Sequence, residues 1–176
     1  TLGRLITGLL VDSPFPIKIV GDKSLSRRDF KRIAKPLKKF GAKLKLNNNY
    51  NLPLTITGSQ NLKPIKYSEN KGSAQVKSSI IFAGAKTNGK SIIKSKKSRD
   101  HTERLFKYLK LPLKLKRKKN FDLIEINKVK KIKPLNYKIP SDLSSCAFFI
   151  ALTVLTKKSK LTIKNVNINS TRKGML

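Results

Sequence analysis

Serine and arginine occur together at three positions that are separated by a constant interval. Ser26, Ser98 and Ser170 lie 72 residues apart. The arginines beside them are Arg27 and Arg28, Arg99, and Arg172. A guanidinium group binds phosphate or carboxylate through two parallel hydrogen bonds, and a serine hydroxyl can donate another. We therefore expect three related loops that collect anions.

The segments around these serines repeat as well. Before each serine lie an apolar helical segment and a short β-branched strand, and an amphipathic helix with further strands follows the first two. The expected helices span residues 5–11, 30–40, 76–85, 103–109 and 143–155. The expected strands span residues 17–20, 42–46, 52–57, 65–67, 91–94, 111–115, 121–126, 137–139 and 161–164. A repeat of this length is typical of stacked equivalent modules, each with its basic loop at a helix start.

The helix ends carry recognisable signals. Gly41 is expected to be the left-handed cap of the first amphipathic helix. Asp100-His101-Thr102-Glu103 fits a capping box, so we favour a capping or supporting role for His101 over a general-base role. Asp142 is expected to cap the helix 143–155 rather than to perform acid–base work. That helix is apolar on every face and should be buried nearly all round.

The composition leaves several functions open. Lys and Arg number 41 against 9 Asp and Glu, which gives a net charge of +32. An anionic partner, such as nucleic acid or a phosphorylated metabolite, would explain the excess, and so would a lysine-biased composition. Cys146 is the only cysteine, which excludes an internal disulfide, and its apolar surroundings predict a buried, inert thiol. No apolar run reaches the roughly 20 residues that span a membrane.

One apparent nucleotide-binding motif is rejected. Residues 84–91 read Gly-Ala-Lys-Thr-Asn-Gly-Lys-Ser and match the P-loop pattern letter for letter. A working P-loop follows a strand and opens a helix, so that helix amides meet the phosphates. Here a helical run precedes the motif and a β-branched strand follows it. We interpret it as a helix end and a turn.

Six blocks in order resemble the EPSP synthase family. Residues 1–5 resemble the end of its Gly-Asn-x-Gly-Thr-x-x-Arg loop, and residues 98–103 match its bacterial Ser-Arg-Asp-His-Thr-Glu block almost letter for letter. The other similar blocks are Gly21 to Arg28, Ser73 to Ser78, Pro140 to Phe149, and Asn169 to Gly174. Gly3 and Ser141 depart from the family pattern, which bears on local stability more than on identity.

The resemblance implies an α/β (α+β) fold, the inside-out α/β barrel that this family builds from repeated βαβαββ units, here incomplete. Residues 1–138 would form part of the domain that binds the first substrate, shikimate-3-phosphate, with phosphoenolpyruvate. Residues 139–176 would cross into a second, similar domain. The chain starts at Thr1 rather than Met, and Met175 and Leu176 resemble a helix start. We therefore expect an internal piece of a longer protein.

The resemblance also implies a reaction and a set of site residues. The family transfers the enolpyruvyl group of phosphoenolpyruvate to the 5-hydroxyl of shikimate-3-phosphate. By matching positions, Ser73, Ala74 and Arg99 would hold the 3-phosphate, and Gln75 would lie between the two substrates. Arg28 would bind phosphoenolpyruvate, with Arg4 and Thr1 lining that side. No metal or organic cofactor is implied.

The general acid–base residues of the family would lie outside this chain, so we expect the piece to be inactive alone. The full-length protein would be a cytoplasmic monomer without membrane or specific nucleic-acid partners. Ser73 could equally be only a helix N-cap, and Arg28 and Arg99 could be solvated charges. Lys77 could reach the substrate loop from the next helical turn.

Three other functions compete with this one. The related enolpyruvyl transferase that acts on UDP-N-acetylglucosamine shares the fold, but the blocks at residues 73–78 and 98–103 favour the shikimate enzyme. A basic nucleic-acid-binding module would need a coherent basic face with stacking aromatics, whereas most aromatic residues here lie in apolar faces. A purely structural repeat protein would not need Ser, Gln and Arg clustered at loop–helix junctions.

Overall fold

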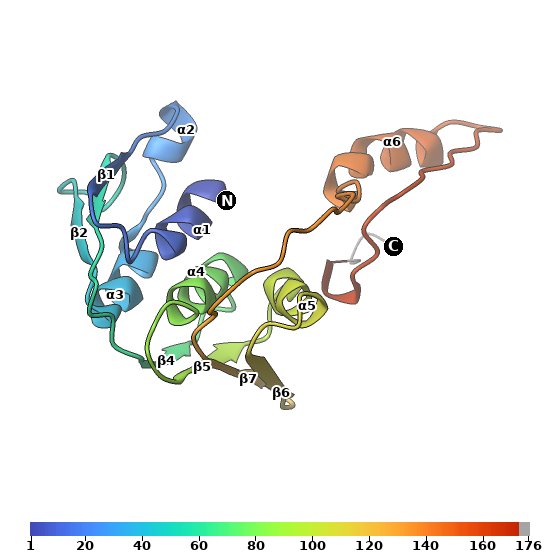
Figure 1. Cartoon of the computed structure of the whole chain (residues 1–176). Coiled ribbons are helices and arrows are strands. Elements are labelled where there is room, and N and C mark those ends of the chain that lie inside the picture. Colours follow the sequence, from blue (N-terminus) through green and yellow to red (C-terminus); the bar gives the residue numbers. More distant parts are fainter. Residues whose placement is uncertain (173–176) are drawn as a thin grey trace. The chain divides into compact units, whose positions relative to one another are not determined.

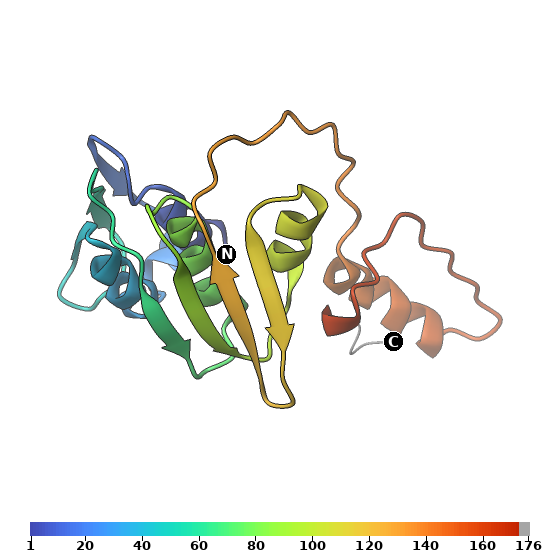
Figure 2. The ribbon, with the colours of Figure 1, turned by 60° about the horizontal axis from the view of Figure 1, so that its bottom comes forward.

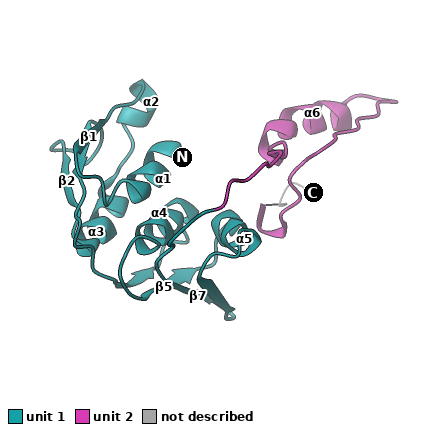
Figure 3. Ribbon diagram, in the orientation of Figure 1, with its two compact units in different colours: residues 1–132 teal, residues 133–176 magenta. Residues whose placement is uncertain are grey.

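The computed structural model describes residues 1–172. The chain forms two compact units, residues 1–132 and 133–176 (Figure 3). The helix start expected at residues 175–176, and the last two residues of the sixth family block, lie outside the described residues. In the part that is described, no helix has the length and apolar character needed to cross a membrane.

The first half of unit 1 is a three-stranded antiparallel sheet with helices on one side (Figure 1). The strand order is β1–β3–β2, and Ile56 of the central strand lies between Ile17 and Leu44. The elements are α1 (Leu2–Leu9), β1 (Pro16–Ile19), α2 (Lys23–Ser26), α3 (Lys31–Phe40), β2 (Lys43–Leu46) and β3 (Leu54–Thr57). Gly41 caps α3 with a φ of 109°, which confirms the expected left-handed cap.

The second half of unit 1 is a four-stranded mixed sheet of order β4–β5–β7–β6. Its elements are β4 (Lys66–Glu69), α4 (Ala74–Gly84), β5 (Ser91–Lys96), α5 (His101–Tyr108), β6 (Leu113–Arg117) and β7 (Phe121–Ile126). Strands β4 and β5 are parallel, and the other pairs are antiparallel. Helices α4 and α5 cover one face of this sheet, which Figure 2 shows from below.

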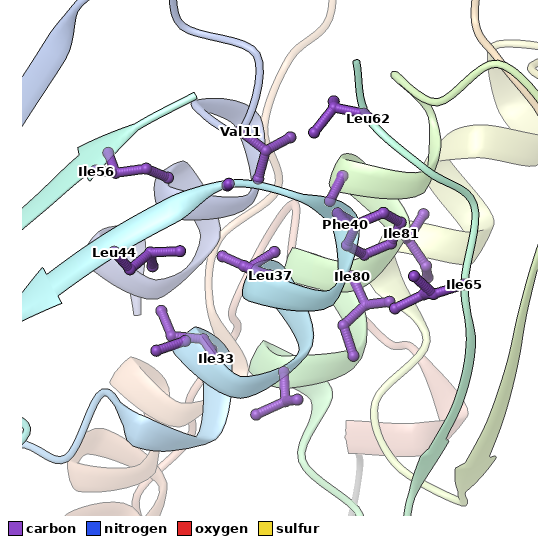
Figure 4. Close-up of a cluster of buried hydrophobic side chains, with 14 of the residues drawn as sticks. Val11, Ile33, Leu37, Phe40, Leu44, Ile56, Leu62, Ile65, Ile80 and Ile81 are labelled. Carbon is purple, nitrogen blue, oxygen red and sulfur yellow. The ribbon is translucent and has the colours of Figure 1, made fainter. Parts of the chain in front are cut away.

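The core of unit 1 lies between its two sheets, and the helices fill it. Ile33, Leu37 and Phe40 of α3 are fully buried, as are Ile80 and Ile81 of α4 (Figure 4). The inward faces of the sheets contribute a second set of buried side chains, which are Leu44, Leu54, Ile56, Ile93, Ile124 and Ile126. Helices inside and sheets outside confirm the predicted inside-out α/β arrangement for this unit.

The alternation of apolar and polar side chains along the strands explains why the sheets lie outside. In β5, the burial alternates, so that Ile93 points inward while Lys94 and Lys96 are exposed. Strand β6 places Lys114 and Lys116 on the same outer face, opposite Glu125 and Leu123 of β7. A strand with period-two alternation buries one face only, so each sheet covers the helices on one side and meets water on the other.

Unit 2 contains α6 (Leu143–Leu155), whose bounds match the sequence prediction, and a short 3₁₀ helix (Ser170–Arg172). Cys146 is buried, as expected. The strands expected at residues 137–139 and 161–164 are wrong: within residues 1–172 the only pairing nearby is one bridge between Ser141 and Val166. A β-branched run becomes a strand only when another backbone pairs with it.

The expectation that α6 is buried nearly all round is also wrong for this chain. Phe148, Val154 and Leu155 are each at least 80% exposed, while Leu143 is 4% exposed. An apolar helix is buried only where other elements pack on it, and the described part of unit 2 holds no other α-helix and no named strand.

Candidate functional site

The candidate site includes the start of α4, which follows directly after a tight loop. Gly72 has a φ of 70°, and a side chain there would lie 3.2 Å from the carbonyl oxygen of Lys97. The buried carboxylate of Glu69 accepts hydrogen bonds from the amides of Lys71 (3.1 Å) and Gly72 (2.8 Å). The loop is therefore fixed from inside the fold, directly beside the segment that precedes Arg99.

Ser73 is the N-cap of α4, and its hydroxyl oxygen accepts a hydrogen bond from the amide of Val76 at 3.4 Å. Ser73, Ala74 and Gln75 are all partly exposed. The first amides of a helix have no partner within the helix and carry partial positive charge. The alternative that Ser73 is an N-cap is thus confirmed. The same geometry leaves the backbone amides at the start of α4 accessible to an anion.

Gln75 joins the starts of α4 and α1. Its carboxamide oxygen accepts a hydrogen bond from Nη1 of Arg4 at 2.7 Å. Its amide nitrogen donates to the hydroxyl of Thr1 at 3.0 Å. The structure therefore brings together three of the predicted site residues, although Gln75 lies more than 70 positions from both Thr1 and Arg4 in sequence.

Arg4 is held on three sides. Nη2 donates to the carbonyl oxygen of Asp29 at 2.8 Å, and the guanidinium carbon lies 5.6 Å from the centre of the Phe30 ring. Partial burial lowers the pKa of Arg4, and the nearby charges of Arg32 and Arg28 lower it further, against an opposing effect of Asp29. An anion placed among these cations would relieve their repulsion.

Arg28 reaches this cluster from a separate loop. The loop is shaped by Asp22, whose carboxylate caps α2 through the amide of Leu25 at 2.6 Å, and by Ser26, whose hydroxyl donates to the carbonyl oxygen of Gly21. Arg28 follows α2 and is exposed. It forms no ion pair in the part of unit 1 that the structure describes, so its charge is available to a ligand.

Arg99 immediately precedes Asp100, the N-cap residue of α5 (His101–Tyr108). Its side chain is exposed, and Asp100, the N-cap residue, is fully buried. The hydroxyls of Ser78 in α4 and Thr102 in α5 lie 2.6 Å apart. Because Gly72 also packs against Lys97, the start of α5 is held next to the start of α4.

The expected capping box at residues 100–103 is wrong. Asp100 forms no side-chain cap on α5; its carboxylate instead accepts from Nε of Arg104 at 2.9 Å and from Nη2 of Arg117 at 2.6 Å. The hydrogen bond to Asp100 is the main reason why the pKa of Arg117 is raised. His101 is the first residue of α5, and its role stays a prediction.

Lys77 does not reach the substrate loop, contrary to expectation. It is fully buried, and its Nζ lies 2.6 Å from a carboxylate oxygen of Glu103. A lysine at the end of the first turn of a helix can point along the surface or into the core, and here the buried carboxylate of α5 holds it inside. Sequence reasoning also missed the Asp100–Arg117 pair, because Arg117 arrives from a later strand.

Two further expectations are confirmed. The P-loop-like segment begins where α4 ends, at Gly84, and runs into β5 at Ser91, so helix and strand stand in the wrong order for nucleotide binding. In unit 2, the carboxylate of Asp142 caps α6 through the amide of Ser144 at 3.1 Å. Asp142 also pairs with Arg172 at 2.8 Å, so the arginine of the third repeat contacts a helix cap.

The arrangement in unit 1 is suited to binding anions. It combines the amide-rich start of α4 with the cations Arg4, Arg28 and Arg99 on neighbouring loop–helix junctions. Residues 1–172 contain no group of three or more His, Cys, Asp or Glu side chains that could hold a metal ion. Arginine forks and helix amides together can fix both the place and the orientation of phosphate and carboxylate groups.

Comparison with known proteins gives a consistent picture. The family model described as EPSP synthase (3-phosphoshikimate 1-carboxyvinyltransferase) matches residues 1–176. Two curated relatives named 3-phosphoshikimate 1-carboxyvinyltransferase are 40% identical over 177 residues (Endomicrobium trichonymphae) and 42% identical over 178 residues (Caldicellulosiruptor bescii). Each alignment covers 100% of this chain, but only 40% and 41% of the respective relative.

Solved structures agree with the sequence comparison. An EPSP synthase from Acinetobacter baumannii superimposes with a TM-score of 0.79 at 36% identity, covering 96% of this chain and 37% of that chain. The enolpyruvyl transferase NikO from Streptomyces tendae has a TM-score of 0.59 at 13% identity, over 84% of this chain and 35% of that chain. The latter likeness concerns the fold alone.

Proposed function

The chain belongs to the EPSP synthase family, and from this premise we propose that it forms part of the substrate site of a 3-phosphoshikimate 1-carboxyvinyltransferase. The chain spans about 40% of the length of the curated relatives it matches. The reaction itself is therefore proposed for the whole protein, in which these residues bind and orient the substrates. The observation that carries the proposal is the link from Thr1 through Gln75 to Arg4, which joins two loop–helix junctions at one place.

Ser73, Ala74 and Arg99 are proposed to hold the 3-phosphate of shikimate-3-phosphate. The start of α4 supplies amides and the Ser73 hydroxyl, and exposed Arg99 supplies a guanidinium fork. These groups complement a dianion at close range, because charge-assisted hydrogen bonds to phosphate are stronger than neutral ones. Aspartate and glutamate near this place are already paired: Asp100 with Arg104 and Arg117, and Glu103 with Lys77.

Arg4 and Arg28, with Thr1, are proposed to face phosphoenolpyruvate. This substrate carries a phosphate and a carboxylate, so it needs more than one cation. Gln75 follows Ala74 directly in sequence and contacts Arg4. It is proposed to touch both substrates.

In the proposed reaction, the 5-hydroxyl oxygen of shikimate-3-phosphate forms a bond to C2 of phosphoenolpyruvate while C3 gains a proton. The hydroxyl proton then leaves, C3 loses a proton again, and the C2–O bond to phosphate breaks to release inorganic phosphate. Two anionic substrates repel each other, so fixed cations that hold them in contact lower the barrier by offsetting that repulsion and by orienting the reactants. These are the tasks proposed for Arg4, Arg28 and Arg99.

Residues 1–138 are proposed to belong to the domain that binds the first substrate, and residues 139–176 to the crossover into a second, similar domain. The full-length protein is proposed to act as a cytoplasmic monomer with no specific nucleic-acid partner. The family resemblance supports these proposals. Size-exclusion chromatography with light scattering would test the monomer.

A hybrid enzyme tests the function directly. In it, this chain replaces the matching 178-residue segment of the Caldicellulosiruptor bescii relative, and phosphate release from phosphoenolpyruvate is measured. We expect release that depends on shikimate-3-phosphate, and its loss in Arg99→Ala but not in Lys116→Ala, which removes a cation from the outer face of the sheet. A cooperatively folded hybrid without this activity, or one that prefers UDP-N-acetylglucosamine, would contradict the proposal.

A further inference from the structure

A buried ion pair links the two helices that carry the proposed phosphate site. Nζ of Lys77 in α4 lies 2.6 Å from a carboxylate oxygen of Glu103 in α5, and the two side chains are 0% and 1% exposed. The contact is an ion pair by distance, and neither Lys77 Nζ nor either carboxylate oxygen of Glu103 has a hydrogen-bond partner within residues 1–172. A pair so completely withdrawn from water is costly to bury, so its stabilising effect alone does not explain it.

The pair lies directly behind the site. The amide of Lys77 donates to the carbonyl oxygen of Ser73 at 3.0 Å, so Lys77 closes the first turn of α4. Glu103 lies in the first turn of α5, four residues after Arg99. A displacement of either side chain along its helix would therefore move the start of that helix.

A second contact between α4 and α5 lies beside the ion pair, near the starts of both helices. The hydroxyls of Ser78 and Thr102, each adjacent in sequence to a member of the ion pair, lie 2.6 Å apart. Farther along the two helices, Phe82 and Phe106 pack with their ring centres 6.1 Å apart. The contact between the two hydroxyls is directional, so it constrains the relative position of the two helix starts.

The pair also sets the charge behind the site. An unpaired Glu103 carboxylate within one helical turn of Arg99 would repel a phosphate, and its Coulomb effect would be strong because water is excluded. Lys77 neutralises that carboxylate without presenting its own charge to the surface. Arg99 thus remains the cation that a ligand meets.

We propose that Lys77 and Glu103 are positioning residues, which hold the start of α4 and the start of α5 in the register that lets Ser73, Ala74 and Arg99 bind one phosphate group. This inference rests on the proposed function for the identity of the ligand. It adds two residues that would not touch the substrate. Their effect would reach it through Ser73 and Arg99.

The test uses the hybrid enzyme described under the proposed function, which carries this chain, with shikimate-3-phosphate as the probe in calorimetric titrations. Lys77→Met and Glu103→Gln should each lower stability, because an uncompensated charge stays buried. The double variant Lys77→Met/Glu103→Met should regain stability, since apolar replacement of a buried pair is often neutral or stabilising. Its affinity for shikimate-3-phosphate should nevertheless stay about tenfold weaker than that of the wild type, which corresponds to the loss of one well-placed charged contact.

Amide hydrogen exchange provides a readout without ligand. In the double Met variant, exchange at residues 76–78 and 104–106 should become faster than in the wild type, while the stability of the whole unit is retained. Glu125→Gln is the matched control, because Glu125 pairs with Lys90 at 3.7 Å on the exposed outer face. It should change neither affinity nor exchange.

The outcomes separate the inference from the proposed function. If the folded wild-type hybrid does not bind shikimate-3-phosphate, the proposed function fails, and the exchange rates alone decide whether the ion pair holds the two helix starts in place. If the wild type binds, the positioning role requires both weaker binding and faster exchange in the stable double Met variant; either one without the other overturns it. If the double Met variant does not fold, the variant Lys77→Gln/Glu103→Gln replaces it, because its two side-chain amides can hydrogen-bond to each other. The inference then requires this variant to bind shikimate-3-phosphate more tightly than Glu103→Gln alone does. Equal affinities of the two variants would overturn the inference.

Discussion

The carboxamide oxygen of Gln75 accepts a hydrogen bond from Arg4 at 2.7 Å, although the two residues are 71 positions apart. This contact makes the orientation of Gln75 dependent on α1, because the other end of the same amide donates to Thr1. Arg4 in turn is fixed by the carbonyl oxygen of Asp29. The start of α4 and the loop that carries Arg28 are thus connected through one arginine.

Substitution of Gln75 by Glu separates the contact from the charge. Gln75→Glu keeps an acceptor for Arg4 but neutralises that cation, so the affinity of the hybrid enzyme for phosphoenolpyruvate should fall by about tenfold or more. Gln75→Ala removes the contact and leaves the charge, so its loss should be smaller. The KM for phosphoenolpyruvate measures both. A Glu variant that binds phosphoenolpyruvate as well as the wild type does would show that Arg4 faces no anion.

Neighbouring arginines allow a matched comparison. Arg27 and Arg28 are both exposed, but only Arg28 of the two affects the pKa of Arg4. We expect Arg28→Ala to raise the KM for phosphoenolpyruvate by about tenfold, the magnitude of one charge-assisted contact. Arg27→Ala should leave it within about twofold, since a solvated surface charge contributes little. Equal effects of the two changes would indicate general electrostatic attraction instead of a specific contact.

Asp100 should be a stability residue and not a ligand. Its buried carboxylate accepts from both Arg104 and Arg117, and Asn could satisfy only part of this arrangement. Because both arginines are half exposed, water compensates some of the loss, and Asp100→Asn should lower the free energy of unfolding by about 1–3 kcal/mol. Urea unfolding followed by circular dichroism measures the change, with Glu125→Gln as a control expected to stay within about 0.5 kcal/mol. An unchanged midpoint for Asp100→Asn would contradict this assignment.

Local patterns in the sequence predicted the elements well where each element is determined by its own residues. The period of α6 and the alternation of β7 gave bounds that the structure reproduces, Leu143–Leu155 and Phe121–Ile126. Gly41 was identified from its position after an amphipathic helix, and its positive φ has the same local origin. The clustering of Thr1, Arg4 and Gln75 followed from the family resemblance, and their contacts agree with it.

Expectations failed where the deciding partner lies far away in sequence. Residues 161–164 have the composition of a strand, but pairing depends on another backbone. Asp100 had the spacing of a capping box, yet Arg117 from β6 takes its carboxylate. Lys77 looked like a surface cation, and only the fold places Glu103 against it. The partner of a charged side chain inside a core is determined by the tertiary structure, so a local sequence pattern cannot predict it.

The two buried glycines of α1 should respond in opposite ways to the same change. A methyl group on Gly8 would collide with the backbone carbonyl oxygen of Ser79 in α4, which cannot yield without moving that helix. Gly8→Ala should therefore lower the free energy of unfolding by about 3 kcal/mol, at the upper end of typical overpacking costs. It should also weaken the contact between Arg4 and Gln75, because the two helices would be pushed apart.

A methyl group on Gly3 would instead lie 3.5 Å from Leu25 and 3.6 Å from Phe30, which is ordinary packing distance. Gly3→Ala gains helix propensity and should raise the free energy of unfolding by about 0.5–1 kcal/mol. Thermal and urea unfolding of the two variants, measured side by side, provide the check. Destabilisation by Gly3→Ala, or tolerance of Gly8→Ala, would show that α1 and α4 do not pack as closely as described, and the link between Arg4 and Gln75 would lose its structural basis.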